Sequence, residues 1–120
     1  MMSQNPLVSV AIITYNQKIF LEECIESILL QTYKNIEIII ADDGSSDGTH
    51  QLAQNFQENY PDIKFKLALS KLNFGITNNS NLAFENCSGK YIAWMGGDDL
   101  MHPKKLKLKF GLWKVTRVAL

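Results

Sequence analysis

The sequence predicts an α/β protein with a Rossmann-like open sheet, mostly parallel, and helices on both of its faces. Three observations support this prediction. Short β-branched runs alternate with stretches whose apolar residues recur at helical spacing, which is the pattern of βαβ units. No internal repeat, low-complexity segment or linker interrupts the alternation. The length of 120 residues suits one core, so we predict a single domain over 1–120.

The first half of the chain contains two expected buried strands, each followed by an expected helix. Leu7–Thr14 is a β-branched run typical of a strand buried on both faces. The stretch 19–32 places apolar residues at helical spacing, with glutamates on the other side. Ile36–Ala41 predicts the second strand. Asp47 is expected to cap the next helix, which Pro61 ends.

The second half continues the same alternation. Residues 62–69 alternate between apolar side chains and lysines, which is typical of a half-exposed strand near a sheet edge. Thr77 or Asn78 is expected to open a short helix. Lys90–Met95 predicts a fourth strand, and a last helix is expected to begin at His102–Pro103.

Polar residues follow all four expected strands. Because parallel strands end at one edge of a sheet, these ends should form a single rim, where open α/β folds bind ligands. Carboxylate pairs suit hard cations such as Mg²⁺ or Mn²⁺, which bridge to phosphate. The four ends are Thr14-Tyr15-Asn16, Asp42-Asp43-Gly44-Ser45, Asn73-Phe74-Gly75 and Asp98-Asp99.

Each of these features also has a simpler interpretation. Asp42-Asp43-Gly44 could be a solvated turn, and Gly96-Gly97-Asp98-Asp99 could be a loop with helix-capping acids. The occurrence of both pairs at equivalent strand ends favours a ligand site. Tyr15 and Trp94, taken singly, fit core or rim packing better than a stacking platform. His50 has no partner that the sequence identifies.

Composition and charge limit the possible functions. The formal net charge is zero, but Leu100–Leu120 holds six of the twelve Lys/Arg and no acid. That segment predicts either a solvated helix face or a peripheral contact with an anionic membrane, and not nucleic-acid binding. Cys24 and Cys87 are expected to be buried thiols, and nothing in the sequence suits zinc. Without a signal peptide or a membrane-length apolar run, a cytoplasmic location is expected.

Four segments together carry a resemblance to a known family: "VSVAIITYNQ", "QTYKNIEIIIADDGSSDGT", "NFGITNNSNLA" and "GKYIAWMGGDDLMHPKKL". They resemble the N-terminal, nucleotide-sugar-binding half of the family 2 glycosyltransferases, which have the GT-A fold. The resemblance covers roughly Pro6 to Lys107, and 108–120 is predicted to be an atypical tail. Relatives often carry an acid at the position of Gly96 and an Arg at the position of Ser80, and this chain departs from both.

The resemblance implies a site. Thr14 and Tyr15 would line the base pocket, Asp43 would accept a hydrogen bond from the base, and Asp42 would shape the turn. The nucleotide-binding residues implied are Thr14, Tyr15, Asn16, Asp42, Asp43, Asn73, Gly75 and Asp98, and the ligands of a divalent cation (Mn²⁺ or Mg²⁺) are Asp98 and Asp99.

The implied activity is inverting, metal-dependent transfer of a sugar from a nucleotide-diphosphate sugar to a glycan or lipid acceptor, as in cell-surface polysaccharide synthesis. The chain is expected to be a fragment that retains the donor site, with the general base beyond Leu120. The alternative is a non-catalytic module that binds nucleotide sugars or a partner. A phospho-receiver domain is excluded because it needs its acid pair after the first strand.

Overall fold

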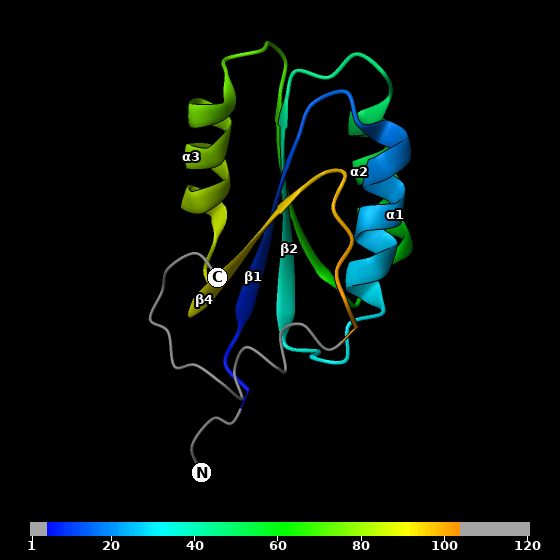
Figure 1. Ribbon diagram of the computed structural model, residues 1–120, viewed down its shortest axis with the longest axis vertical. Helices are drawn as coiled ribbons and strands as arrows, with labels where there is room; N and C mark the ends of the chain where they lie inside the picture. Colours follow the sequence, from blue (N-terminus) through cyan, green and yellow to red (C-terminus); the bar gives the residue numbers. More distant parts are fainter. Residues whose placement is uncertain (1–4, 104–120) are drawn as a thin grey trace.

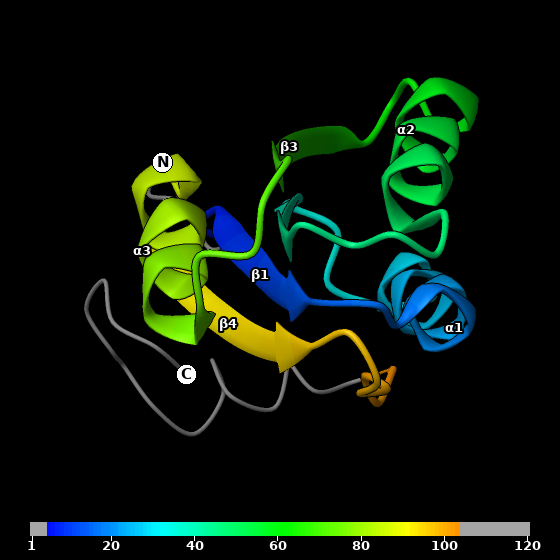
Figure 2. The ribbon, with the colours of Figure 1, turned by 90° about the horizontal axis from the view of Figure 1, so that it is seen from above.

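The computed structural model describes residues 5–103, which form a four-stranded sheet between two layers of helices (Figures 1 and 2). All pairings in the sheet are parallel, and the strand order is β3-β2-β1-β4. The elements, in chain order, are β1 (Val8–Thr14), α1 (Lys18–Leu29), β2 (Ile36–Asp43), α2 (Thr49–Asn59), β3 (Lys64–Ser70), α3 (Ile76–Asn86) and β4 (Tyr91–Gly96).

The helices cover both faces of the sheet, which confirms the predicted fold class. Figure 2 shows α1 and α2 on one face and α3 on the other. The larger core lies under α1 and α2, and a smaller one lies under α3. Because both faces are covered, β1 and β2 are almost entirely buried, and this explains their continuous apolar runs.

Most boundaries lie within two residues of those expected. The strand β2 is longer than predicted, so Asp42 and Asp43 belong to the ladder, opposite Thr14 and Ser70. The strand β3 lies at an edge of the sheet, as its alternation predicts. The helix expected after His102–Pro103 and the tail 108–120 lie outside the described residues.

The strand order reverses next to β1. Successive connections place β2 and then β3 on one side of β1, after which α3 crosses the opposite face and β4 pairs with the other side of β1. All four strands run in the same direction, so their polar ends lie at one edge (Figure 1). The gap between the ends of β1 and β4 is the position at which such folds bind ligands.

The chain after β4 packs against α1. Met101 is buried in the larger core, and its N–H donates to Ser27 Oγ at 2.9 Å. Gln31 Nε2 donates to the carbonyl of His102 at 2.9 Å. Both contacts fix the segment that carries Asp98 and Asp99.

Two further findings concern the cysteines and the length of the helices. Cys24 and Cys87 are buried and form no disulfide, as predicted. No helix of the part of the chain described here is long and apolar enough to cross a membrane.

Candidate functional site

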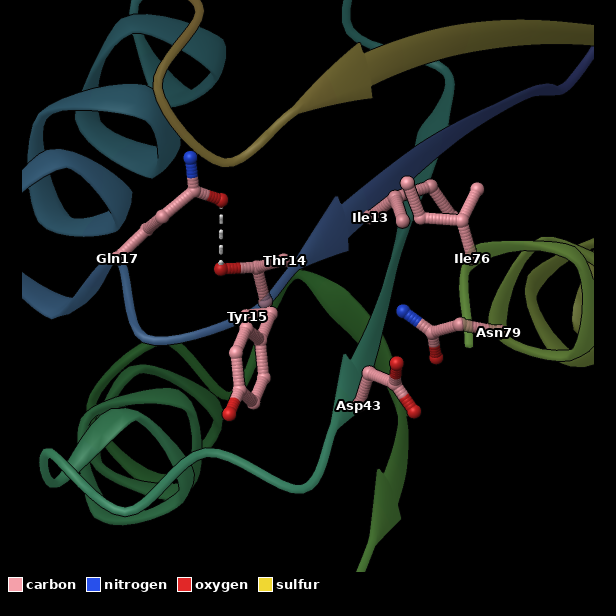
Figure 3. Close-up of a pocket in the computed structure, with 7 residues that line it drawn as sticks. All are labelled: Ile13, Thr14, Tyr15, Gln17, Asp43, Ile76 and Asn79. Carbon is pink, nitrogen blue, oxygen red and sulfur yellow. Dashed lines mark hydrogen bonds between the residues drawn. The ribbon is translucent and has the colours of Figure 1, made fainter. Parts of the chain in front are cut away.

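A cleft opens at the carboxyl edge of the sheet, between β1, β2 and α3 (Figure 3). Its volume is about 230 Å³. A second hollow of about 410 Å³ shares part of its wall and extends over the end of β4. The first is lined by Ile13, Thr14, Tyr15, Gln17, Asp43, Ile76 and Asn79. The second is lined by Ile13, Gln17, Ile76, Ser80, Trp94, Met95 and Gly96.

Asp43 lies at the end of β2 and faces the cleft. It is only 5% exposed, and its two oxygens accept hydrogen bonds from the N–H groups of Phe74 at 2.8 Å and Gly75 at 3.0 Å. Gly75 has a φ of +99°, a conformation that favours glycine. An ionised carboxylate has about four acceptor positions, so Asp43 keeps acceptor capacity for a ligand.

Asp42 has a different environment from its neighbour. Its side chain is fully buried and accepts from the Ser45 N–H at 2.8 Å, from Ser45 Oγ at 2.5 Å and from His50 Nε2 at 2.7 Å. His50 therefore has a partner, and it lies eight residues back along the chain. Asp42 does not line the cleft; its side chain contacts Ser45, in the turn after β2, and His50, in the first turn of α2.

Three side chains, those of Asn16, Ser45 and Asp47, join the loop after β1 and the start of α1 to the loop after β2. The Asn16 N–H donates to Ser45 Oγ at 2.7 Å, and Asn16 Oδ1 accepts from the Ser46 N–H at 2.8 Å. Asp47 accepts from the N–H of Lys18 at 3.0 Å and from that of Thr49 at 3.1 Å. These two residues begin α1 and α2, whose N-cap residues are Gln17 and Gly48. Asp47 is therefore not the N-cap that the sequence predicts, but its carboxylate accepts from the first N–H of each helix.

The pKa of Asp47 reflects these contacts. Desolvation raises the pKa of Asp47, but the hydrogen bonds from Thr49 and Lys18 together lower it by more than desolvation raises it. The pKa of Asp47 therefore lies below its usual value. The loop junction therefore keeps its negative charge next to two helix N-termini, where an anion is stabilised.

Asp98 and Asp99 form an exposed carboxylate pair directly after β4. Asp99 Oδ2 accepts from the Gly96 N–H at 2.8 Å. A Cβ built on Gly96 would lie 3.1 Å from an oxygen of Asp98 and 3.4 Å from one of Asp99. Both carboxylates therefore lie over Gly96, at the end of the second hollow.

Gly97 packs this turn against β1. Its N–H donates to the carbonyl of Ile13 at 2.9 Å. A Cβ at this position would lie 2.6 Å from Thr14 Oγ1 and 2.8 Å from Gln17 Oε1, which is closer than carbon and oxygen can approach. A larger residue at position 97 would therefore force the side chains of Thr14 and Gln17, or the turn that carries the acid pair, to shift.

The acid pair fits a divalent cation of the Mg²⁺ class. Such ions are usually held by one or two carboxylates together with substrate phosphates and water. Within residues 5–103, no cluster of three or more His, Cys, Asp or Glu could hold a metal ion by itself. A cation at Asp98 and Asp99 would therefore take its remaining ligands from a bound diphosphate and water.

Comparison with known proteins identifies the family. A sequence model of glycosyl transferase family 2 matches residues 9–117. The chain belongs to this family. The match also includes most of the stretch 108–120 that the sequence analysis treats as atypical.

Two curated relatives illustrate this family membership. A Bacillus subtilis (strain 168) protein named as glycosyltransferase EpsE is 42% identical over 106 residues, which are 88% of this chain and 38% of the relative. Chondroitin synthase of Escherichia coli is 39% identical over 103 residues, 86% of this chain and 15% of the synthase. This family 2 chain thus spans well under half the length of the relatives it matches.

Solved structures give the same result for the fold. The mannosyltransferase PcManGT from Pyrobaculum calidifontis, in complex with GDP-Man and Mn²⁺, has a TM-score of 0.80 at 26% identity over 87% of this chain and 31% of that one. TarS 1–349 of S. aureus, in complex with UDP-GlcNAc, has a TM-score of 0.75 at 25% identity over 87% of this chain and 30% of that one. The GT-A fold assignment is confirmed.

In this family 2 chain the structure brings together only some of the expected residues. Thr14, Tyr15 and Asp43 line one cleft. The backbone of Gly75 contacts Asp43, whereas the exposed Asn73 precedes it outside the cleft. Asn16 and Asp42 build the adjoining loops, as described above. The nucleotide contacts of all these residues remain predictions.

The sequence did not predict four of the residues that line the first cleft: Ile13, Gln17, Ile76 and Asn79. Asn79 is 2% exposed. It lies four residues before the buried Ala83 and thus on the same face of α3. That spacing was the available signal for a buried polar residue at the sheet.

Proposed function

We propose that this chain is the donor-binding part of a metal-dependent, inverting glycosyltransferase that uses a nucleotide-diphosphate sugar. The observation that carries the proposal is the pair of adjoining hollows along the carboxyl edge. The buried carboxylate of Asp43 lines one hollow, and the exposed pair Asp98 and Asp99 lies over Gly96, which lines the other.

The end at β2 suits a nucleobase. Ile13 and Ile76 supply apolar walls, and Tyr15, which is 47% exposed, lines the same cleft. Asp43 accepts a hydrogen bond from a ring N–H of the base with its remaining capacity. Thr14 and Asn16 hold the loop after β1, and Asn73 is expected to contact the nucleotide from the loop before α3.

The end at β4 suits the diphosphate. Asp98 and Asp99 hold the cation there, with Asp98 also close to the ribose. Such a cation stabilises the negative charge that develops on the nucleoside diphosphate as it leaves. Ser80 lines the neighbouring hollow where relatives often carry Arg, so this chain relies on the acid pair and the cation to hold the phosphates.

The acceptor half of the reaction lies outside these residues. We expect a glycan or lipid hydroxyl as acceptor and a carboxylate beyond Leu120 as general base. The relatives named above extend well past the length of this chain. A cytoplasmic location, with the basic C-terminal segment at the inner membrane face, remains a prediction from the sequence.

Calorimetric titration tests the donor site. We expect GDP or UDP to bind this chain when Mn²⁺ is present, and Asp99→Ala to weaken that binding at least tenfold because one carboxylate ligand is lost. Asp62→Ala, which removes an exposed acid between α2 and β3, is the matched control and should bind normally.

A folded chain that binds no nucleoside diphosphate in Mn²⁺ would refute the donor site. Binding that is equal with and without Mn²⁺ would refute the metal role of Asp98 and Asp99. Release of nucleoside diphosphate from a nucleotide sugar separates the enzyme from the alternative, a non-catalytic binding module.

A further inference from the structure

Asn79 has an unusual hydrogen-bonding state on the floor of the cleft. Its side chain is 2% exposed, and its Nδ2 donates to the carbonyl of Ala41 at 2.8 Å. A carbonyl oxygen only accepts, so this bond fixes the orientation of the amide. Asn79 Oδ1 is buried and has no hydrogen-bond partner among residues 5–103. An unpaired buried acceptor is costly and calls for an explanation.

The unpaired oxygen lies next to a second acceptor. Figure 3 shows that Asn79, from α3, and Asp43, from β2, point toward one another across the same cleft. The donors on Asp43 are the backbone groups of Phe74 and Gly75. A ligand edge that enters between the two side chains therefore meets two acceptors and must supply donors.

The nucleobases differ in how they meet this requirement. Guanine carries two adjacent donors, the ring N1–H and the exocyclic N2 amine. Uracil has a single N3–H between two carbonyls, one of which would oppose Asn79 Oδ1. Adenine and cytosine each place a ring acceptor beside their amine, and that acceptor would oppose one of the two side chains. Two neighbouring acceptors therefore favour guanine.

We propose that Asn79 makes the donor site selective for guanine nucleotides. Its Oδ1 accepts from the exocyclic amine, while Asp43 accepts from N1–H. The inference rests on the donor site proposed above. The fold by itself does not determine which nucleobase binds, because one similar solved structure holds GDP-Man and another holds UDP-GlcNAc.

The test compares GDP, inosine diphosphate and UDP by calorimetry in Mn²⁺. Inosine diphosphate keeps the ring N–H of guanine and lacks only the exocyclic amine. We expect GDP to bind about tenfold more tightly than inosine diphosphate, and at least tenfold more tightly than UDP, since one hydrogen bond in a buried site is worth about that factor.

Two variants test whether Asn79 is the source of the preference for GDP over inosine diphosphate. Asn79→Ala should reduce the preference for GDP over inosine diphosphate to about twofold or less. Asn81→Ala is the matched control, because Asn81 lies on the same helix and is exposed; it should keep the preference. Asn79→Ala also removes the bond to Ala41, so the comparison of the two nucleotides on the unchanged chain is decisive even if the variant does not fold.

The outcomes separate this inference from the proposed function. Equal affinity for GDP and inosine diphosphate, or tighter binding of UDP, would overturn the base assignment while the metal-dependent donor site stands. Failure of all three nucleotides to bind a folded chain would overturn both.

Discussion

The two ends of the parallel sheet both carry acids, but their hydrogen-bonding states are opposite. At the amino end, Glu37 is fully buried and accepts from Ser9 Oγ at 2.6 Å and from both the N–H and Oγ of Ser88 at 2.7 and 2.9 Å. Lys66 Nζ lies 3.2 Å away. The donors come from β1, from β3 and from the loop between α3 and β4.

Apart from Asp42, which is buried and accepts three hydrogen bonds, the acids at the carboxyl end keep unused acceptor capacity. Asp43 holds two backbone donors, and Asp98 and Asp99 are exposed to solvent. Glu37 and Asp43 are both buried, so the number of hydrogen bonds that each carboxylate already accepts, and not its burial, distinguishes the acid that joins the strands from the acid proposed to bind a base. The predictions below test this difference, and they run from the largest expected effect to the smallest.

Glu37→Ala should have the largest effect on stability. The substitution leaves Ser9, Ser88 and Lys66 without their shared acceptor, and breaking a buried pair in this way costs about 3–5 kcal/mol. Urea unfolding measures the change. Glu58→Ala, at an exposed position on α2, is the control. A loss below about 1 kcal/mol would show that the amino end does not depend on this carboxylate.

Stability should also fall in acid because of Glu37. Desolvation raises its pKa, but the hydrogen bonds from Ser9, Ser88 and Lys66 outweigh it and lower the pKa from 4.5 to about 2. A lowered folded-state pKa adds stability above the unfolded value of 4.5, and that stability is lost as the pH falls toward 2. The difference corresponds to at most about 3 kcal/mol.

Urea unfolding at pH 7 and pH 3 measures this loss. Glu37→Gln should show a smaller change than the unchanged chain, because its side chain does not titrate. Asp47, whose pKa is also lowered, is common to both proteins and cancels in the comparison. Identical pH profiles for the two proteins would argue against the assignment.

Gly97→Ala should combine a loss of stability with a loss of binding. The new methyl group would overlap Thr14 Oγ1, and relief of such overlap costs about 1–3 kcal/mol. The shift also moves Asp98 and Asp99, so metal-dependent nucleotide affinity should fall. In Gly96→Ala the nearest atoms are oxygens of those two exposed carboxylates, which can move away, and we expect a smaller effect on urea unfolding.

Asp98→Ala should have the smallest effect on stability, within about 0.5 kcal/mol, because the side chain is exposed. Metal-dependent nucleotide affinity should nevertheless fall about tenfold. Calorimetry and urea unfolding of the same preparation measure both quantities. Destabilisation comparable to that of Glu37→Ala would erase the distinction between the two ends of the sheet.

The sequence was sufficient for the fold and for the polar rim. The buried runs of β1 and β2, the alternation of β3 and the helical spacing of α1 each depend on local periodicity. Since parallel strands end at one edge, the positions of the acid pairs followed from the strands alone. No tertiary detail was needed for either inference.

The side-chain contacts between neighbouring elements could not be predicted from periodicity. The hydrogen bond between His50 and Asp42 depends on how the chain after β2 folds back. Asn79 and Asp43 line the same cleft only because α3 packs beside β2. The dual contact of Asp47 depends on the distance between the starts of α1 and α2. Periodicity reports which face of an element is buried, and it is silent on which neighbour that face contacts.

The junction formed by Asn16, Ser45 and Asp47 has a consequence for the energetics of recognition. These three side chains hold the loops after β1 and β2 together by hydrogen bonds within the protein. A ligand therefore enters a preorganised rim, and little conformational entropy has to be lost there on binding. With the loops fixed, preference among ligands depends on the few side chains that project from them, so single substitutions in the cleft can change selectivity without reshaping the backbone.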